Sequence, residues 1–104
     1  MKQITVSDEY GNKYILEYSK NTIMRMEKSG FVFDEIESKP VLMTTLLYQG
    51  AFLKNHPNTK GETMDKIYDS LANKELLFKK LAEMYLEQSD ALVDEGNSEW
   101  EANW

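Results

Sequence analysis

The stretch RMEKSGFVFDEIESKP, residues 25 to 40, carries the signals that decide the fold. It ends one helical segment at Gly30, because glycine readily adopts the left-handed conformation that follows the last turn of many helices. It starts another helix at Pro40, whose fixed φ suits the first helical turn. Three large apolar side chains lie between them: Phe31, Phe33 and Ile36. We therefore predict a link between two helices that adds aromatic side chains to an apolar groove.

The segment after the link, residues 40 to 55, is the most apolar part of the chain. Drawn as a helix, it has apolar side chains around most of its circumference, and a helix of that kind is buried nearly all round. A chain of 104 residues can hardly surround such a helix by itself. We therefore expect part of this surface, including Leu47 and Tyr48, to meet another chain, and we predict a homo-oligomer.

The segments before the link predict a β-hairpin followed by a short helix. Residues 2–6 and 13–18 are rich in β-branched and aromatic side chains, and the turn between them contains Gly11. A two-stranded hairpin is marginal in water, so it should pack on the helices. Ser19 or Asn21 is expected to cap the first helix, which is about ten residues long.

The segments after the central helix predict a loop and two more helices. The only histidine, His56, follows the central helix, where an imidazole can meet its last free carbonyls. A loop over 56–62 precedes a short amphipathic helix over 63–72 and a longer one over 74–95. The predicted fold is α+β, mainly α, with an N-terminal β-hairpin packed on about four helices in one domain, residues 1–94.

The acidic groups are concentrated at the C-terminus. The net charge is −6, and seven acidic residues follow Lys80 with no further lysine or arginine. Residues 95–104 are polar and aperiodic, so we predict a flexible acidic tail. Trp100 and Trp104 have no evident place in the core and should either fold back on the domain or anchor a partner. The charge distribution argues against nucleic-acid binding, which needs clustered basic side chains.

No motif in the chain predicts catalysis. Cysteine is absent, which excludes thiol nucleophiles and thiolate zinc sites. The carboxylates of Asp34, Glu35 and Glu37 lack a histidine partner and calcium-loop spacing, so we interpret them as charges near the positive end of the next helix. We predict no enzyme activity, no metal and no cofactor. No stretch reads as a signal peptide or a membrane span, so a cytoplasmic location without membrane contact is expected.

Residues 13 to 90 resemble the small tail assembly chaperones of long-tailed (siphovirus-type) bacteriophages and prophages. The likeness rests on packing and helix-ending signatures: Met26-Glu27, Gly30-Phe31, Lys39-Pro40, Ala51-Phe52, His56, Lys74-Glu75-Leu76 and Met84-Tyr85. The resemblance implies a non-enzymatic protein of the host bacterial cytoplasm. It implies that the protein coats the long helical tape measure protein and helps to recruit tail tube protein.

An apolar groove would let such a protein accept many helical segments. The side chains predicted to bind a partner are Phe31, Phe33, Ile36, Leu47, Tyr48, Trp100 and Trp104. The alternative is a small acidic phage-encoded inhibitor or nucleic-acid mimic of a host protein. That function requires carboxylates spaced along a folded face, whereas here they crowd into the tail.

Overall fold

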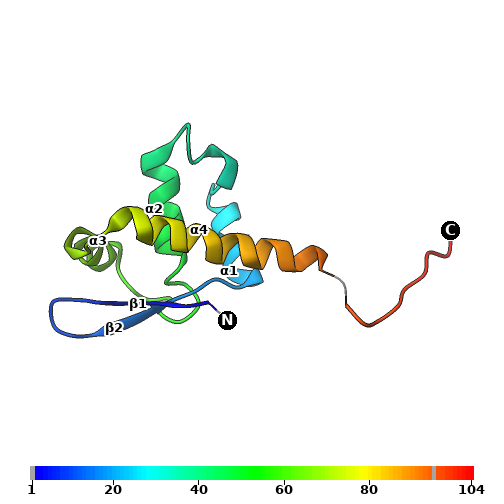
Figure 1. Cartoon of the computed structure of the whole chain (residues 1–104), viewed down its shortest axis with the longest axis horizontal. Helices are drawn as coiled ribbons and strands as arrows, with labels where there is room; N and C mark the ends of the chain where they lie inside the picture. Colours follow the sequence, from blue (N-terminus) through cyan, green and yellow to red (C-terminus); the bar gives the residue numbers. More distant parts are fainter. Residues whose placement is uncertain (1, 95) are drawn as a thin grey trace.

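The computed structural model describes residues 2–94 and 96–104 (Figure 1). It is α+β and mainly helical, as predicted, with an antiparallel hairpin followed by four α-helices. The elements in chain order are β1 (Ile4–Ser7), β2 (Lys13–Leu16), α1 (Lys20–Lys28), the 3₁₀ turn η1 (Phe33–Glu35), α2 (Pro40–Gly50), α3 (Gly61–Ser70), α4 (Lys74–Asp90) and the 3₁₀ turn η2 (Ala91–Val93).

Local sequence signals set the hairpin turn and the ends of α1. Gly11 has φ +81° in the turn and Gly30 has φ +104° after α1, a region that glycine enters without steric cost. The Ser19 side chain caps α1 by accepting a hydrogen bond from the Thr22 amide, and the Thr22 side chain accepts one from the Ser19 amide. Pro40 occupies the first turn of α2. The predictions for the hairpin, for α1 and for the start of α2 are confirmed.

The central helix is shorter than predicted, because α2 ends at Gly50 and residues 51–55 form turns. These turns lie along the outer edge of β2. The Glu17 amide donates to the Ala51 carbonyl at 3.1 Å, and the Asn55 side chain donates to the Ile15 carbonyl at 3.1 Å. The exposed backbone groups of a strand edge need partners. The hydrogen bonds from these turns to the edge of β2 therefore take the place of the helical hydrogen bonds that a longer α2 would make.

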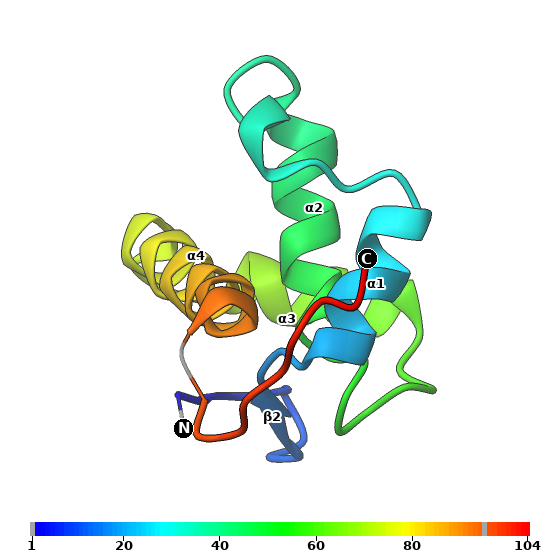
Figure 2. The same cartoon turned by 90° about the vertical axis from the view of Figure 1, so that its right-hand side faces the viewer.

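The helices and the hairpin enclose one hydrophobic core. Figure 2 shows α1 and α4 on either side of α2, with the hairpin below them. The buried apolar side chains come from every strand and α-helix and from the segments between them: Val6, Leu16, Tyr18, Ile23, Met26, Phe31, Met43, Leu47, Tyr48, Ala51, Phe52, Met64, Ile67, Leu81, Met84 and Tyr85. In contrast to the expectation of nearly complete burial for α2, Val41 and Leu42 at its start are exposed.

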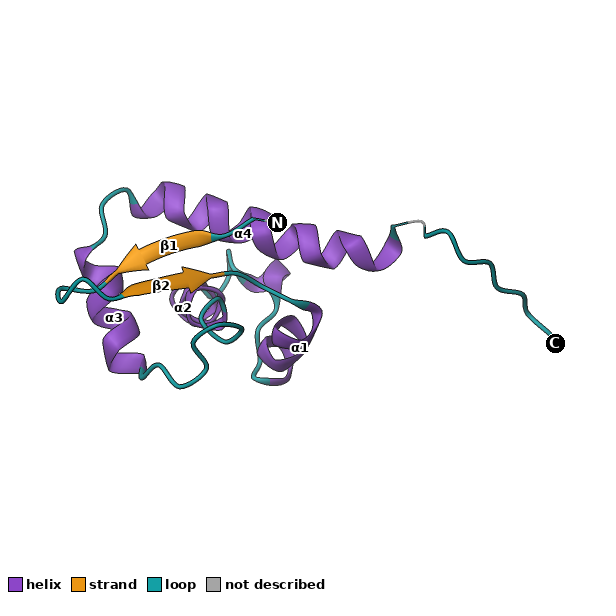
Figure 3. Cartoon of the chain, turned by 90° about the horizontal axis from the view of Figure 1, so that it is seen from below, coloured by secondary structure: helices purple, strands orange, loops and turns teal. Residues whose placement is uncertain are grey.

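Helix α4 runs along β1 and leads into the C-terminal arm, residues 96–104 (Figures 1 and 3). Lys2, just before β1, pairs with Glu83 at 3.8 Å and with Glu87 at 3.1 Å. The helix was predicted to reach residue 95, but it ends at Asp90, and residue 95 lies outside the described residues. The arm contains no helix or strand, is exposed throughout and extends away from the domain.

Within residues 2–94 and 96–104, every helix is too short or too polar to span a lipid bilayer.

Candidate partner-binding surfaces

Three of the side chains predicted to bind a partner lie in the core. Phe31, Leu47 and Tyr48 are between 0% and 3% exposed. The Tyr48 hydroxyl donates to the Met64 carbonyl at 2.8 Å, which ties α2 to α3. Burial raises the pKa of the Tyr48 hydroxyl, and the nearby carboxylate of Asp65 adds to this. These three residues therefore stabilise the domain and leave little side-chain surface for a partner.

Phe33 and Ile36 in the link are half-buried and pack against the core. The Phe33 ring stacks on the Tyr85 ring of α4, with centroids 5.3 Å apart and planes 10° apart. Phe31 meets the same Tyr85 ring edge-on at 5.2 Å. Offset stacked and edge-on arrangements are the favoured geometries of aromatic pairs. Through these two rings, the link between α1 and α2 packs against α4.

An apolar groove lies between the first half of α2 and α3. Its volume is about 320 Å³. The lining residues are Pro40, Val41, Thr44, Thr45, Tyr48, Asp65 and Tyr68. Val41 is 82% exposed at the groove, and Leu42 beside it is 53% exposed. Val41 therefore gives the groove an apolar side chain that the domain does not use for its own core.

Of the residues that line this groove, Tyr48 was predicted to bind a partner, whereas Val41 and Tyr68 were not. An even apolar circumference does not indicate which side of a helix faces solvent, so Val41 could not be separated from its buried neighbours. Tyr68 of α3 is half-buried. Its ring meets the Tyr48 ring edge-on at 5.0 Å, which forms one wall of the groove.

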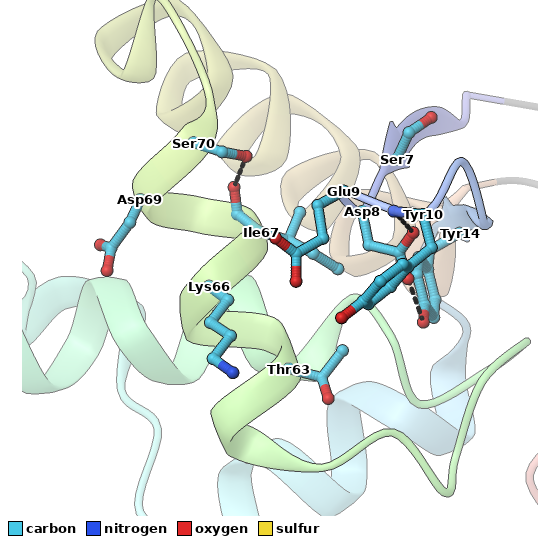
Figure 4. A pocket seen from close by; sticks show the side chains of 10 residues that line it. All are labelled: Ser7, Asp8, Glu9, Tyr10, Tyr14, Thr63, Lys66, Ile67, Asp69 and Ser70. Carbon is cyan, nitrogen blue, oxygen red and sulfur yellow. Dashed lines mark hydrogen bonds between the residues drawn. The ribbon is translucent and has the colours of Figure 1, made fainter.

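A second, more polar cleft of about 620 Å³ lies between the hairpin turn and α3 (Figure 4). The Asp8 carboxylate at this cleft accepts hydrogen bonds from the amides of Tyr10 and Asn12, both at 2.9 Å. Partial desolvation raises the pKa of Asp8, but bonds from Asn12, Tyr10 and Tyr14 together outweigh it and leave the pKa below its ordinary value. The carboxylate thus serves to hold the turn.

The buried carboxylate of Glu17 joins the hairpin to the turns after α2. It accepts hydrogen bonds from the side chains of Asn55 at 2.9 Å and Gln3 at 3.1 Å, and it pairs with Lys54 at 3.0 Å. The Asn55 bond lowers the pKa of Glu17, desolvation opposes it, and Lys54 and Gln3 lower the pKa further. Since donors surround the carboxylate, its role is structural.

His56 also binds the hairpin. It was predicted to meet the last carbonyls of the central helix, and that prediction is wrong because the helix ends six residues earlier, at Gly50. Its Nε2 atom instead accepts a hydrogen bond from the Ile15 amide at 2.9 Å. Its ring lies edge-on to Tyr14, with centroids 5.1 Å apart. His56 therefore covers the edge of β2.

The acidic link residues do not form a metal site. Glu35 pairs with Lys39 at 3.3 Å, one helical turn away. Throughout the part of the chain that the structure describes, no three histidine, aspartate or glutamate side chains come close enough together to hold a metal ion.

The two tryptophans lie on the arm with their side chains open to solvent. Trp100 is 84% exposed, and Trp104 is exposed in full. Trp100 is in the middle of the arm sequence and Trp104 at its end, and the arm extends beyond the end of α4 (Figures 1 and 3). Exposed tryptophans are costly in water and are enriched at protein interfaces.

Fold and surfaces together define a small α+β domain that offers an apolar groove and an aromatic arm. The chain belongs to the family described as a domain of unknown function, DUF5055, which it matches over residues 1–104. The match therefore includes the arm as well as the domain. Neither the curated proteins nor the solved structures contain a significant match to the chain.

Proposed function

We propose that the chain is a non-enzymatic protein-binding module that acts as a tail assembly chaperone. In this role the chain binds the tape measure protein. During tail assembly it also helps to recruit tail tube protein to the tape measure protein. The observation that carries the proposal is the apolar groove between α2 and α3, which is lined in part by the exposed side chain of Val41. The resemblance to tail assembly chaperones supplies the identity of the client.

The groove suits a helical client. An amphipathic helix can bind by laying its apolar face into an apolar groove between two helices. Val41 and Leu42 lie in the first turn of α2, so their side chains are available without unfolding of the domain. The tape measure protein is a long helical chain whose apolar stripes would aggregate if left bare. A groove that contacts apolar side chains through shape alone can accept many of its segments.

Charge at the groove adds a preference among client segments. Asp65 lines the groove beside Tyr68 and pairs with no lysine or arginine among the described residues. A carboxylate at the rim of an interface favours partners that bring a positive charge to it. We therefore expect the preferred client segments to carry a lysine or arginine next to their apolar stripe.

The surface charges of the domain do not favour nucleic-acid mimicry. Many of its glutamates are paired with lysines: Glu17 with Lys54, Glu35 with Lys39, Glu62 with Lys66, Glu75 with Lys79, Glu83 with Lys2 and Lys80, and Glu87 with Lys2. A mimic needs a row of unneutralised carboxylates in place of phosphates. Most of these pairs lie on the surface, where they neutralise carboxylates that such a row would need.

Hydrogen exchange locates the binding surface directly. The full chain is measured alone and with purified tape measure protein from the genome that encodes it. We expect slower exchange in the first half of α2 and in α3 when the client is present, with β2 unchanged. Slower exchange only in other elements would show that the client does not bind in the groove. Unchanged exchange throughout the chain at saturating client would refute the chaperone function.

A further inference from the structure

The hairpin has one closed edge and one open edge. On the closed edge, the Ile15 amide donates to His56 and the Ile15 carbonyl accepts from Asn55. Thr5 of β1 lies directly opposite Ile15. Opposed residues of an antiparallel pair alternate between exchanging two hydrogen bonds and exchanging none, so Thr5 belongs to a pair that exchanges none. The amide and carbonyl of Thr5 therefore point outward from β1.

The same alternation turns the backbone groups of Gln3 and Ser7 outward. Within the described ranges the sheet has two strands, and no other segment makes a backbone hydrogen bond to this edge of β1. A row of unpaired amides and carbonyls is a template for another strand. The open edge of β1 is therefore a site for strand addition.

The last six residues of the arm alternate as a strand does, although the tail as a whole has no helical period. Residues 99–104, EWEANW, place polar side chains at the odd positions and Trp100, Ala102 and Trp104 at the even ones. Because successive side chains of a strand point to opposite faces, an extended arm has one apolar and one polar face. In the structure the arm is exposed and extends away from its own domain (Figures 1 and 3).

The surroundings of the open edge suit such a strand. Figures 1 and 3 both place α4 along β1, so an added strand would lie beside this helix. Glu83 of α4 pairs with Lys2, which lies next to β1. Leu76 is seven residues, or two helical turns, before Glu83, so Leu76 and Glu83 lie on the same face of α4. Leu76 is 47% exposed. It offers apolar surface to an indole from the apolar face of the arm.

We propose that the arm of one copy adds as a third strand to the β1 edge of a second copy. Trp100 and Trp104 then face α4, while Glu99 and Glu101 remain in solvent. This contact gives the chain a means of self-association that leaves the groove between α2 and α3 open. It does not depend on the identity of the client.

The test follows the fluorescence and mass of the full chain over a range of concentrations. Trp100 and Trp104 are the only tryptophans, so their emission reports on the arm. We expect water-like emission in dilute protein and a blue shift together with a rise in mass as concentration increases. A blue shift that does not depend on concentration would mean that the arm binds its own domain, and water-like emission at all concentrations would mean that it binds neither. Both results overturn the proposal.

Two variants establish strand addition. Thr5→Pro removes an outward amide that the hairpin does not use, and proline is tolerated on an edge strand in that position. The exchange Trp100→Glu with Glu101→Trp keeps the composition and charge of the arm but moves one indole to its polar face. We expect each to weaken self-association at least tenfold. Association of unchanged strength in the exchanged variant would overturn the proposal, and since the exchange lies in the arm this result is informative even if Thr5→Pro fails to fold.

Discussion

Gly50 at the end of α2 lies directly against the side chain of Met26 in α1. A Cβ atom at position 50 would be 2.7 Å from Met26 Cγ and would also overlap its sulfur and methyl groups. Met26 is buried, so its side chain has little room to move. The absence of a side chain at Gly50 therefore sets how closely α1 and α2 approach.

The first prediction is that Gly50→Ala destabilises the domain. Overpacking of a core costs about 1–3 kcal/mol, and the better helix propensity of alanine returns only part of it, so we expect a net loss of about 1–2 kcal/mol. Urea unfolding measures it. Gly61→Ala is the matched control, because the nearest atom to its new Cβ is 3.9 Å away. Equal stability of the two variants would contradict the packing described for Met26.

Glu17→Gln should lower stability near neutral pH and flatten its dependence on acid. The variant keeps the shape of the side chain but places an amide among donors, which we expect to cost about 1–3 kcal/mol. Because folding lowers the pKa of Glu17 from its ordinary 4.5, the ionised group stabilises the folded chain above that value. This contribution is lost as the pH falls through the lower folded-state pKa.

Urea unfolding of wild type and Glu17→Gln at a series of pH values checks this. The difference in the free energy of unfolding should be largest near neutral pH and should shrink in acid. A difference that stays constant down to the acid limit would show that the charge of Glu17 does not contribute.

Phe52→Ala and Leu42→Ala compare two apolar residues from the segment that the sequence predicts as one helix. Phe52 is fully buried between Tyr14 and Tyr48, with ring centroids 5.8 and 5.2 Å away. Its truncation should cost about 3–5 kcal/mol of stability. Leu42 is 53% exposed, so its truncation should cost less than about 1 kcal/mol. Thermal melts that rank the two variants in the opposite order would contradict the burial described for Phe52 and the exposure described for Leu42.

Local signals predicted most of the fold. The glycine after α1, the proline at the start of α2 and the turn around Gly11 act on their own neighbours, so their effects can be read without knowing the tertiary structure. Mainly helical α+β architecture follows from them. The positions of the strands and the starts of all four α-helices agree with the structure to within a few residues.

The end of α2 and the role of His56 could not be predicted, since both depend on contacts between distant residues. The helix stops at Gly50 so that the following turns can reach β2, forty residues earlier in the chain. Nothing in residues 50–56 alone indicates that contact. For the same reason His56 was placed at a helix end, whereas its imidazole binds the Ile15 amide.

The candidate surfaces were predicted only in part. For Trp100 and Trp104 the sequence left two alternatives open, folding back on the domain or anchoring a partner, and the structure shows both side chains exposed. The groove could not be predicted, because a helix that is apolar all round does not indicate which of its faces is buried. Leu47 and Tyr48 were therefore expected to bind a partner, and they lie with their side chains in the core.

The most direct test of the chaperone proposal is a binding titration of purified tape measure protein with wild type, Val41→Asp and Asn58→Asp. Val41→Asp puts a charge at the groove but does not strain the fold, because an acidic side chain in the first turn of α2 favours the helix dipole. Asn58→Asp adds the same charge in an exposed loop as the matched control. We predict saturable binding by wild type and Asn58→Asp and a loss of at least about tenfold for Val41→Asp, or roughly 1.4 kcal/mol. Failure of the wild type to bind, or equal binding by all three proteins, would contradict the account.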